Sequence, residues 1–227
     1  MDTIKPIAAI KTDFPEKFGI PRQSGRIDAL EGEIRFYPEY ASFDAVRGLE
    51  EFNYLWILWR FDLPKDSVFH ATVRPPRLGG NTRIGVFATR SPFRPNHIGL
   101  SCVRLKRIAI EDARPVLYVA GVDMADGTQI YDIKPYIPYT DMREDALGGF
   151  ADLHKDHALN VIFPKELLDR FPEDKKEGIL AILAEDPRPS YQEDPERIYG
   201  ISFAGFNVQF KIAAATLTVT AVTPILS

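Results

Sequence analysis

The residues best suited to chemistry lie between positions 74 and 101, which read RPPRLGGNTRIGVFATRSPFRPNHIGLS. This stretch holds five arginines among four prolines and four glycines. Proline and glycine set sharp turns, so the guanidinium groups are expected to be held in place, and fixed donors bind anions with little loss of conformational freedom. Arginine is also suited to forked contacts with phosphate or carboxylate. The stretch therefore predicts an anion-binding loop.

Charge is distributed unevenly along the chain. The net charge is −4, from 28 basic and 32 acidic residues, which argues against a protein coated with nucleic acid. Between Ser67 and Ile110, however, there are eight Lys or Arg residues and no Asp or Glu, whereas Asp141 to Arg197 holds 15 acidic and 8 basic residues. A solvated face is the simpler interpretation of a charged run. Here the arginines sit in turns, which favours a local anion site.

Two further polar loops accompany this stretch. Residues 123–141 (DMADGTQIYDIKPYIPYTD) set carboxylates and tyrosines around an Asp-Gly turn, and residues 21–25 (PRQSG) form a short loop entered by proline. Turn chemistry alone explains any one of them. The three together predict loops that converge on a pocket.

Several familiar chemistries are disfavoured. The segment LGGNTRIG lacks the spacing of a dinucleotide or phosphate loop. His154 and His157 have no third ligand spaced nearby, so no metal is expected. The single cysteine, Cys102, cannot form an internal disulfide, which suggests a reducing, cytoplasmic setting. No apolar run approaches the ~20 residues of a membrane-spanning helix, and the N-terminus does not resemble a secretory signal.

The elements that must position these loops are mainly β. The pattern of short apolar runs and dense turns predicts an antiparallel barrel or sandwich over residues 1–140. A polar linker is expected over 141–160 and a small α+β domain over 161–227, with helices at Pro164–Phe171 and Glu173–Ala184. In Tyr54–Phe61 both alternating sets are apolar, which predicts a strand covered on both sides. The expected strands are Ile4–Ile10, Gly32–Phe36, Tyr54–Phe61, Phe69–Val73, Arg83–Ala88, Gly99–Ile110, Val116–Val122 and Gln129–Lys134. The tail, Ile198–Lys211 and Ala215–Ile225, is expected to hold two or three more.

Longer motifs resemble a known family across almost the whole chain. They are KFGIPRQSG, AVRGLEEFNYLWILW, TVRPPRLGGNTRIGVFATRSPFRPNHIGLS, DGTQIYDIKPYIPY, AEDPRPSY and FNVQF. On these motifs the chain resembles the TsaA-like or YaeB family of tRNA N6-adenosine methyltransferases. The resemblance implies an S-adenosylmethionine-dependent enzyme that is built on a β-barrel and works as a homodimer. It also implies a substrate, tRNA carrying N6-threonylcarbamoyladenosine at position 37, whose N6 is methylated.

The same resemblance implies the site residues. The expected cofactor contacts are Pro21, Arg22, Gln23, Phe61, Asp62, Arg90, Leu100, Asp126, Gly127, Thr128 and Gln129. One departure is visible, because the family usually has Pro where this chain has His97. That change is expected to affect the stiffness of the loop or the substrate preference rather than to abolish cofactor binding.

Methylation of this acceptor predicts further roles. The acceptor nitrogen belongs to a urea-like group and must lose its proton, so a general base is expected. By residue type the candidates are Asp126, Asp132 and Tyr136. The substrate's threonyl carboxylate suits a clamp by Arg74, Arg77 or Arg94, and Arg188 is a candidate RNA contact. Two alternatives stay open: a non-catalytic barrel that binds RNA or a nucleotide, and a methyltransferase with another acceptor.

Overall fold

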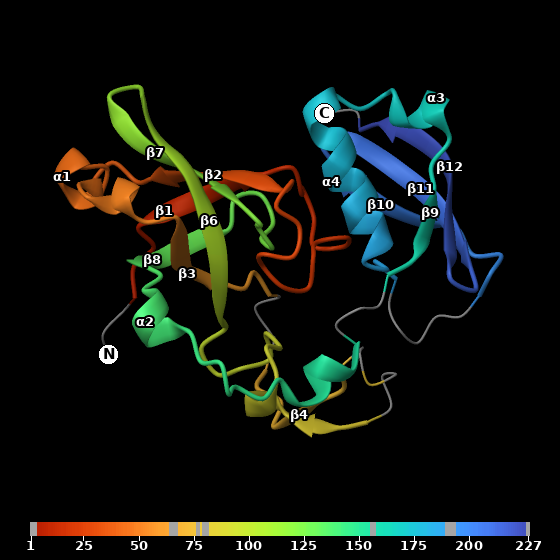
Figure 1. Cartoon of the computed structure of the whole chain (residues 1–227), viewed down its shortest axis with the longest axis horizontal. Helices are drawn as coiled ribbons and strands as arrows, with labels where there is room; N and C mark the ends of the chain where they lie inside the picture. Colours follow the sequence, from red (N-terminus) through yellow and green to blue (C-terminus); the bar gives the residue numbers. More distant parts are fainter. Residues whose placement is uncertain are drawn as a thin grey trace.

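Antiparallel strands of the N-terminal half close into a barrel in the computed structural model, which describes residues 4–63, 68–75, 78, 82–154, 158–188 and 194–225 (Figure 1). Around the barrel the strand order is β1-β2-β7-β6-β3-β8, and every neighbouring pair is antiparallel. This confirms the mainly β fold class and selects the barrel over the sandwich. The barrel strands are β1 (Ala8–Thr12), β2 (Glu31–Phe36), β3 (Tyr54–Arg60), β6 (Ile98–Glu111), β7 (Arg114–Ala120) and β8 (Gln129–Pro135).

Alternation along the strands builds the barrel interior. In β3 the side chains of Leu55, Ile57 and Trp59 are buried inside, while the alternate set from Tyr54 to Leu58 is only half-buried on the outer face. The expectation that this strand is covered on both sides is therefore wrong. Its outer side chains are aromatic and apolar because neighbouring loops, rather than a second sheet, partly shield them.

Between β3 and β6 the chain leaves the barrel and forms an arm. The arm carries β4 (Thr72–Val73), β5 (Ile84–Gly85) and the 3₁₀ turn η3 (Val86–Ala88), and Figure 1 shows it set apart from the barrel. The strands predicted here are too long, because the chain turns at Val86, whose carbonyl accepts hydrogen bonds from the Thr89 amide and hydroxyl. The other short elements of this half are α1 (Phe43–Val46), η1 (Leu49–Glu51), α2 (Pro138–Asp141) and η4 (Gly149–His154).

A four-stranded sheet with helices forms the C-terminal part. Its order is β10-β11-β12-β9, and β9 runs parallel to β12. The small α+β arrangement is confirmed, and α4 has the predicted bounds, whereas α3 is shorter than expected and β9 was not predicted. The domain boundaries at 140 and 161 stay a prediction. The elements are β9 (Asn160–Ile162), α3 (Lys165–Leu168), α4 (Glu173–Ala184), β10 (Tyr199–Phe203), β11 (Phe206–Ala213) and β12 (Thr216–Pro224).

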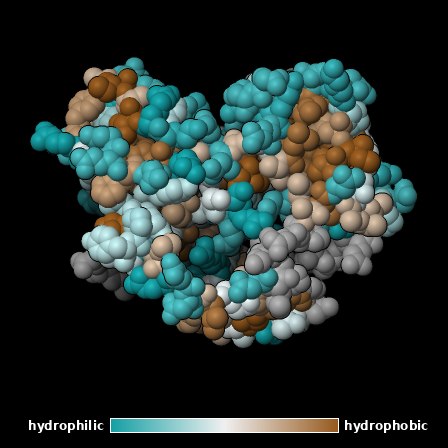
Figure 2. Space-filling model, viewed as in Figure 1, coloured by the Kyte–Doolittle hydropathy of each residue, from teal (hydrophilic) through white to brown (hydrophobic). Residues whose placement is uncertain are grey.

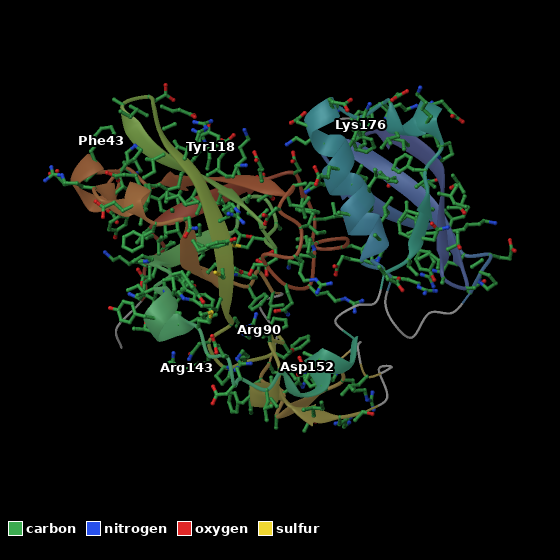
Figure 3. All side chains as sticks on the ribbon, in the orientation of Figure 1. Phe43, Arg90, Tyr118, Arg143, Asp152 and Lys176 are labelled. Atoms are coloured by element: carbon green, nitrogen blue, oxygen red, sulfur yellow. The ribbon has the colours of Figure 1, made fainter. Side chains whose placement is uncertain are left out.

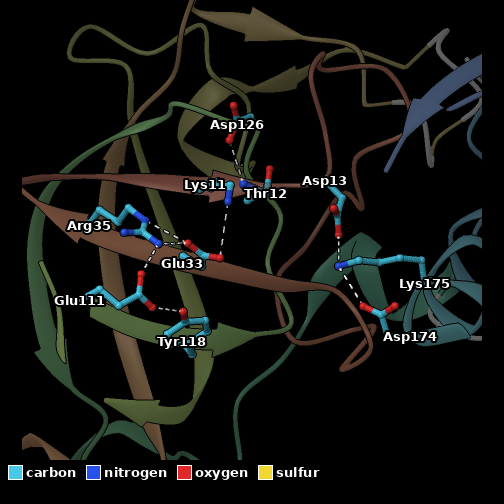
Figure 4. Close-up of polar contacts among 10 residues, drawn as sticks. All are labelled: Lys11, Thr12, Asp13, Glu33, Arg35, Glu111, Tyr118, Asp126, Asp174 and Lys175. Atoms are coloured by element: carbon cyan, nitrogen blue, oxygen red, sulfur yellow. Dashed lines mark hydrogen bonds and ion pairs between the residues drawn. The ribbon is translucent and has the colours of Figure 1, made fainter. Parts of the chain in front are cut away.

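The two parts share a continuous core. The rings of Phe14 and Phe203 lie 5.3 Å apart, and both side chains are only 1% exposed. Helix α4 approaches the barrel closely at Gly178, where a Cβ atom would lie 3.1 Å from a Leu30 methyl. The ammonium of Lys175 pairs with the Asp13 carboxylate at 2.7 Å (Figure 4). This contact anchors the start of the loop that runs on from Phe14. None of the described helices is long and apolar enough to cross a membrane.

Candidate functional site

A large cleft lies between the barrel and the arm. Its volume is about 2090 Å³. Figure 2 shows the surface hollowed between the barrel, the arm and the C-terminal part. Small-molecule sites occupy roughly 300–1,000 Å³, so this cleft has room for a ligand together with part of a larger partner. Its walls come from residues 15–23, 59–63, 87–94, 98–100 and 123–129, with parts of the arm and of η4.

The cleft is cationic although the chain is acidic. Of the described residues that line it, seven are Lys or Arg and four are Asp or Glu. Three other basic residues of the acid-free run lie on β6, where Arg104 pairs with Asp28 at 3.2 Å, Lys106 faces Glu31 and Arg107 stacks on Tyr118. The basic lining residues are Lys17, Arg22, Arg60, Arg74, Arg83, Arg90 and Arg94, and the acidic ones are Glu16, Asp62, Asp123 and Asp126.

The structure brings the expected cofactor positions together. All eleven line this one cleft, although they come from five separate segments of the chain. Their contact with a cofactor stays a prediction. These residues are Pro21, Arg22, Gln23, Phe61, Asp62, Arg90, Leu100, Asp126, Gly127, Thr128 and Gln129.

Local contacts hold several of these side chains in place. The guanidinium of Arg90, which lies near the start of β6 in Figure 3, donates to Gln23 Oε1 at 2.5 Å. The carboxylate of Asp126 accepts from the Thr12 amide at 3.0 Å (Figure 4), and Thr128 is buried. Leu100 is 49% exposed and lines the cleft. The cleft thus offers fixed polar groups beside an open apolar surface.

The candidate bases are separated by the fold. Asp126 lies at the cleft, but Asp132 and Tyr136 are not among the described residues that line it. Asp132 stands opposite Leu58 on the outer face of the barrel, and its carboxylate pairs with Lys134 at 2.8 Å. The Tyr136 ring packs 5.7 Å from that of Trp56. Their catalytic roles stay predictions that this placement does not support.

The candidate substrate arginines are also divided. Arg74 is exposed at the cleft, and Arg94 lines it while donating to the Val86 and Thr89 carbonyls at 3.0 and 2.7 Å. Arg77 lies outside the described residues. Arg188 is not among the described lining residues, and its guanidinium pairs with Asp186 at 3.0 Å. Arg94 therefore holds the arm's own backbone, which leaves Arg74 as the best-placed candidate for substrate.

His97 occupies an unusual backbone conformation. Its φ is 49°, its Nδ1 lies 2.8 Å from the Pro92 carbonyl, and its own carbonyl accepts from the Phe61 amide. Proline fixes φ near −65°, so a proline at this position requires the turn to change shape. The departure at His97 thus concerns backbone geometry at the edge of the cleft.

Sequence reasoning missed one carboxyl group, that of Asp123. The Asp123 side chain is half-buried and lines the cleft. Its Oδ1 accepts a hydrogen bond from the Ser101 hydroxyl at 2.6 Å, and the Ser101 oxygen accepts one from the Trp59 indole at 2.8 Å. Burial raises the pKa of Asp123 to about 6, against the opposing effect of the Ser101 hydrogen bond. The signal in the sequence was Ser101, a polar residue at an inward position of an apolar strand.

The fold and the site define a class, that of small antiparallel β-barrel proteins whose loops enclose a cationic cleft suited to an anionic ligand. Comparison with known proteins narrows that class. Residues 9–142 match the model of the tRNA-methyltransferase O N-terminal domain, and residues 156–225 match that of the TrmO C-terminal domain. The chain therefore belongs to the TrmO family.

Relatives of this chain carry matching descriptions. It is 40% identical, over 96% of both chains, to the tRNA (adenine(37)-N6)-methyltransferase of Escherichia coli K12. It is 38% identical, over 92% of its length and 91% of the relative, to the putative S-adenosylmethionine-dependent methyltransferase RcsF of Pseudomonas aeruginosa. The crystal structure of TrmO from P. aeruginosa matches with a TM-score of 0.78 at 32% identity, covering 99% of this chain and 97% of that one. The family resemblance, with the methyltransferase class and cofactor it implied, is confirmed.

Proposed function

We propose that this protein is an S-adenosylmethionine-dependent methyltransferase that acts on N6 of adenosine 37 in tRNA, with N6-threonylcarbamoyladenosine as the acceptor. The observation that carries the proposal is the convergence of all eleven expected cofactor positions on one cationic cleft. The activity named for the E. coli relative, which matches nearly the full length, supports the same reaction.

The residues at the cleft fit the chemistry of this cofactor. The exposed Leu100 side chain and the Phe61 ring offer an apolar surface for an adenine base. The carboxylate of Asp126 suits the cofactor's cationic ammonium group, and Arg90 suits its carboxylate. When bound, S-adenosylmethionine supplies a methyl group on sulfur that is transferred by in-line displacement. The chain's own contribution is to align the acceptor and to exclude water.

Arg74 is the residue we assign to the threonyl carboxylate of the acceptor. Its side chain is exposed at the cleft, and arginine binds carboxylates through two parallel hydrogen bonds. Arg94 acts indirectly, because its bonds to the Val86 and Thr89 carbonyls fix the turn beside Arg90. The remaining cationic residues of the cleft suit the phosphates of the RNA, which position it without reading its sequence.

The arm offers aromatic surface for RNA bases. The Phe87 side chain is 70% exposed at the cleft, and the Phe69 ring stacks on it with 6.3 Å between centroids. The Arg94 guanidinium lies 5.4 Å from the Phe87 ring. Proteins bind unpaired RNA bases by stacking them on aromatic rings near arginine. Bases of the anticodon loop beside the target adenosine are the partners that suit this surface.

A homodimer and a cytoplasmic location complete the proposal. Three large hydrophobic side chains follow the barrel in close succession and are strongly exposed: Tyr139 at 86%, Met142 at 56% and Leu147 at 95%. Such a row suits a contact with a second copy. Light scattering of the purified protein tests this, and a monomer at working concentration would contradict it.

The described residues hold no group of three His, Cys, Asp or Glu placed for a metal ion, and catalysis without a metal stays a prediction.

Cofactor binding separates an enzyme from a non-catalytic RNA-binding module. Calorimetry is expected to show S-adenosylmethionine binding that Arg90→Ala weakens. Arg107→Ala is the matched control, because Arg107 stacks on Tyr118 away from the cleft, and it is expected to bind like the wild type. RNA affinity without any cofactor binding would favour the binding module.

The acceptor is tested with tRNA that either carries or lacks the threonylcarbamoyl group. We expect methylation of the modified tRNA alone. We also expect Arg74→Ala to raise the KM for the modified tRNA more than it lowers kcat. Equal activity on both tRNAs would contradict the carboxylate clamp. Methylation at another nucleoside would instead support the alternative acceptor.

A further inference from the structure

We propose that Asp123 is the base that takes the N6 proton of the acceptor, an inference that rests on the proposed function. Asp123 lies three residues after the end of β7 and lines the cleft together with Arg90, Leu100 and Asp126. It thus stands among the positions expected to hold the methyl donor.

The direction of its hydrogen bonds follows from simple chemistry. An indole N–H only donates, so the Ser101 oxygen accepts from Trp59 and its single hydrogen points to Asp123 Oδ1. Oδ1 is thereby fixed as an acceptor of a hydrogen bond from inside the barrel, and the carboxylate keeps further lone pairs that can receive a proton. Trp59 is 7% exposed and Ser101 is fully buried, so water does not compete for these two bonds. The barrel interior therefore sets the orientation of this carboxyl group.

The surroundings adjust Asp123 for proton transfer. Burial raises its pKa to about 6, while the Ser101 hydroxyl, the amides of Asp123 and Ser24 and the charge of Arg90 lower it. The groups that face it thus come from β6, from the loop around Ser24 and from the turn after η3, and Asp126 lies three residues further along its own loop. A base works best when its pKa lies close to the working pH. At neutral pH this carboxyl is ionised and ready to accept a proton.

The other carboxylates at the cleft are less suitable. Glu16 accepts from the Ser202 hydroxyl at 2.5 Å, which ties it to the C-terminal sheet. The Asp62 side chain is 87% exposed and pairs with Lys17, and Asp126 is exposed at the rim. Water solvates these exposed groups and weakens them as bases. Asp123 alone among the four combines burial with a hydrogen-bond chain into the barrel.

The step balances without another reactant. The N6 lone pair forms the bond to the methyl carbon, and the bond from that carbon to sulfur breaks with its electron pair left on sulfur. The N6 proton passes to the Asp123 carboxylate and leaves from there to solvent.

The first test compares Asp123→Asn with Asp112→Asn. Asparagine keeps an oxygen that accepts from Ser101 but does not take the proton, so kcat is expected to fall by about 10²–10⁴-fold while S-adenosylmethionine affinity, measured by calorimetry, is retained. Asp112 lies exposed in the turn at the far end of β6, and the same substitution there is expected to leave kcat unchanged.

The second test measures the titration of Asp123 directly. Carbon NMR of the carboxyl in the protein without cofactor is expected to give a pKa of about 6, and kcat/KM, which reports the free enzyme, is expected to rise with pH through the same value. Ser101→Ala removes a hydrogen bond to the charged form, so the pKa and the acid limb of kcat/KM both move to higher pH. This variant decides the question if Asp123→Asn does not fold.

Two results overturn the inference while leaving the proposed function intact: wild-type kcat in Asp123→Asn, or an acid limb that Ser101→Ala does not move. Failure of the wild-type protein to methylate the modified tRNA would instead contradict the proposed function itself.

Discussion

Trp59 and Gly99 stand opposite each other across β3 and β6, and this pair shapes the wall of the cleft. A Cβ atom at Gly99 would lie 2.3 Å from the Trp59 indole, so the ring occupies space that only glycine leaves free. The indole in this position reaches Ser101, which orients Asp123. Because Gly99 has no side chain, the Trp59 indole fits beside β6 and donates to Ser101, which in turn donates to Asp123 at the cleft.

Gly99→Ala is expected to destabilise the protein by about 1–3 kcal/mol, because overpacking displaces the indole. Chemical denaturation measures this. Gly85→Ala is the matched control, since a Cβ there meets no heavy atom within 4 Å, and its effect is expected to stay within about 0.5 kcal/mol. Equal loss in the two variants would contradict the packing argument.

Individual site residues were predictable to different degrees. The eleven cofactor positions followed from motifs, and all of them reach the cleft. The position of Asp132 did not follow from alternation, because the register shifts between Leu58 and Trp59 and moves Asp132 to the face opposite that of Ile130. A bulge of this kind depends on pairing with another strand, which a local sequence pattern does not reveal.

Strands β2, β6 and β7 are joined by a charged network away from the cleft (Figure 4). Arg35 bonds Glu33 at 2.5 Å and Glu111 at 2.7 Å, and Glu111 also accepts from the Tyr118 hydroxyl. The Tyr118 hydrogen bond, followed by that of Arg35, holds the pKa of Glu111 below its usual value. Ionised Glu111 therefore stabilises the folded state.

Glu111→Gln is expected to lower the stability of the barrel at neutral pH. A lowered folded-state pKa contributes stability above the unfolded-state pKa and loses it as pH falls through the folded-state value. The difference from wild type should thus vanish in acid, which denaturation at several pH values measures. Glu166→Gln, at an exposed position on α3, is the control and is expected to show no such trend. A difference that persists at low pH would contradict the assignment.

The arm between β3 and β6 provides the exposed aromatic surface. Phe87→Ala is expected to weaken binding of a tRNA anticodon stem-loop by about 1–3 kcal/mol through loss of stacking. Phe43→Ala is the control, because Phe43 is 46% exposed on α1, far from the cleft in Figure 3. Calorimetry with S-adenosylmethionine distinguishes an RNA effect from a cofactor effect. Equal RNA affinity of the two variants would exclude the stacking surface.

Across the whole molecule, the fold decides which basic residues of the acid-free run lie at the cleft and which pair with acidic residues elsewhere. The acid-free run from Ser67 to Ile110 divides between the cleft and β6, where Arg104 and Lys106 meet acids from the loop before β2 and from β2 itself. The sequence predicted an anion site, and basic residues outnumber acidic ones among the described residues that line the cleft, while anion binding itself stays a prediction. Which arginines serve it depended on strand direction and on contacts between distant segments.

tRNA binding is expected to depend steeply on salt. Three phosphate contacts give a loss of about tenfold or more between 50 and 200 mM salt, because counterions are released from the RNA. S-adenosylmethionine carries no phosphate, so its affinity should change much less. Arg83→Ala removes one of the exposed cleft cations that suit phosphate and is expected to make the salt dependence shallower, whereas Arg104→Ala, whose side chain pairs with Asp28, should leave it unchanged. Equal slopes in the two variants would contradict the placement of RNA at the cleft.

Mass spectrometry of tRNA nucleosides tests the central claim most directly. Purified protein is incubated with S-adenosylmethionine and tRNA that carries N6-threonylcarbamoyladenosine at position 37, beside tRNA that lacks it. The account predicts one added methyl group on that nucleoside and no methylation of the unmodified tRNA. No added methyl on that nucleoside, with the protein folded and its cofactor bound, would contradict it.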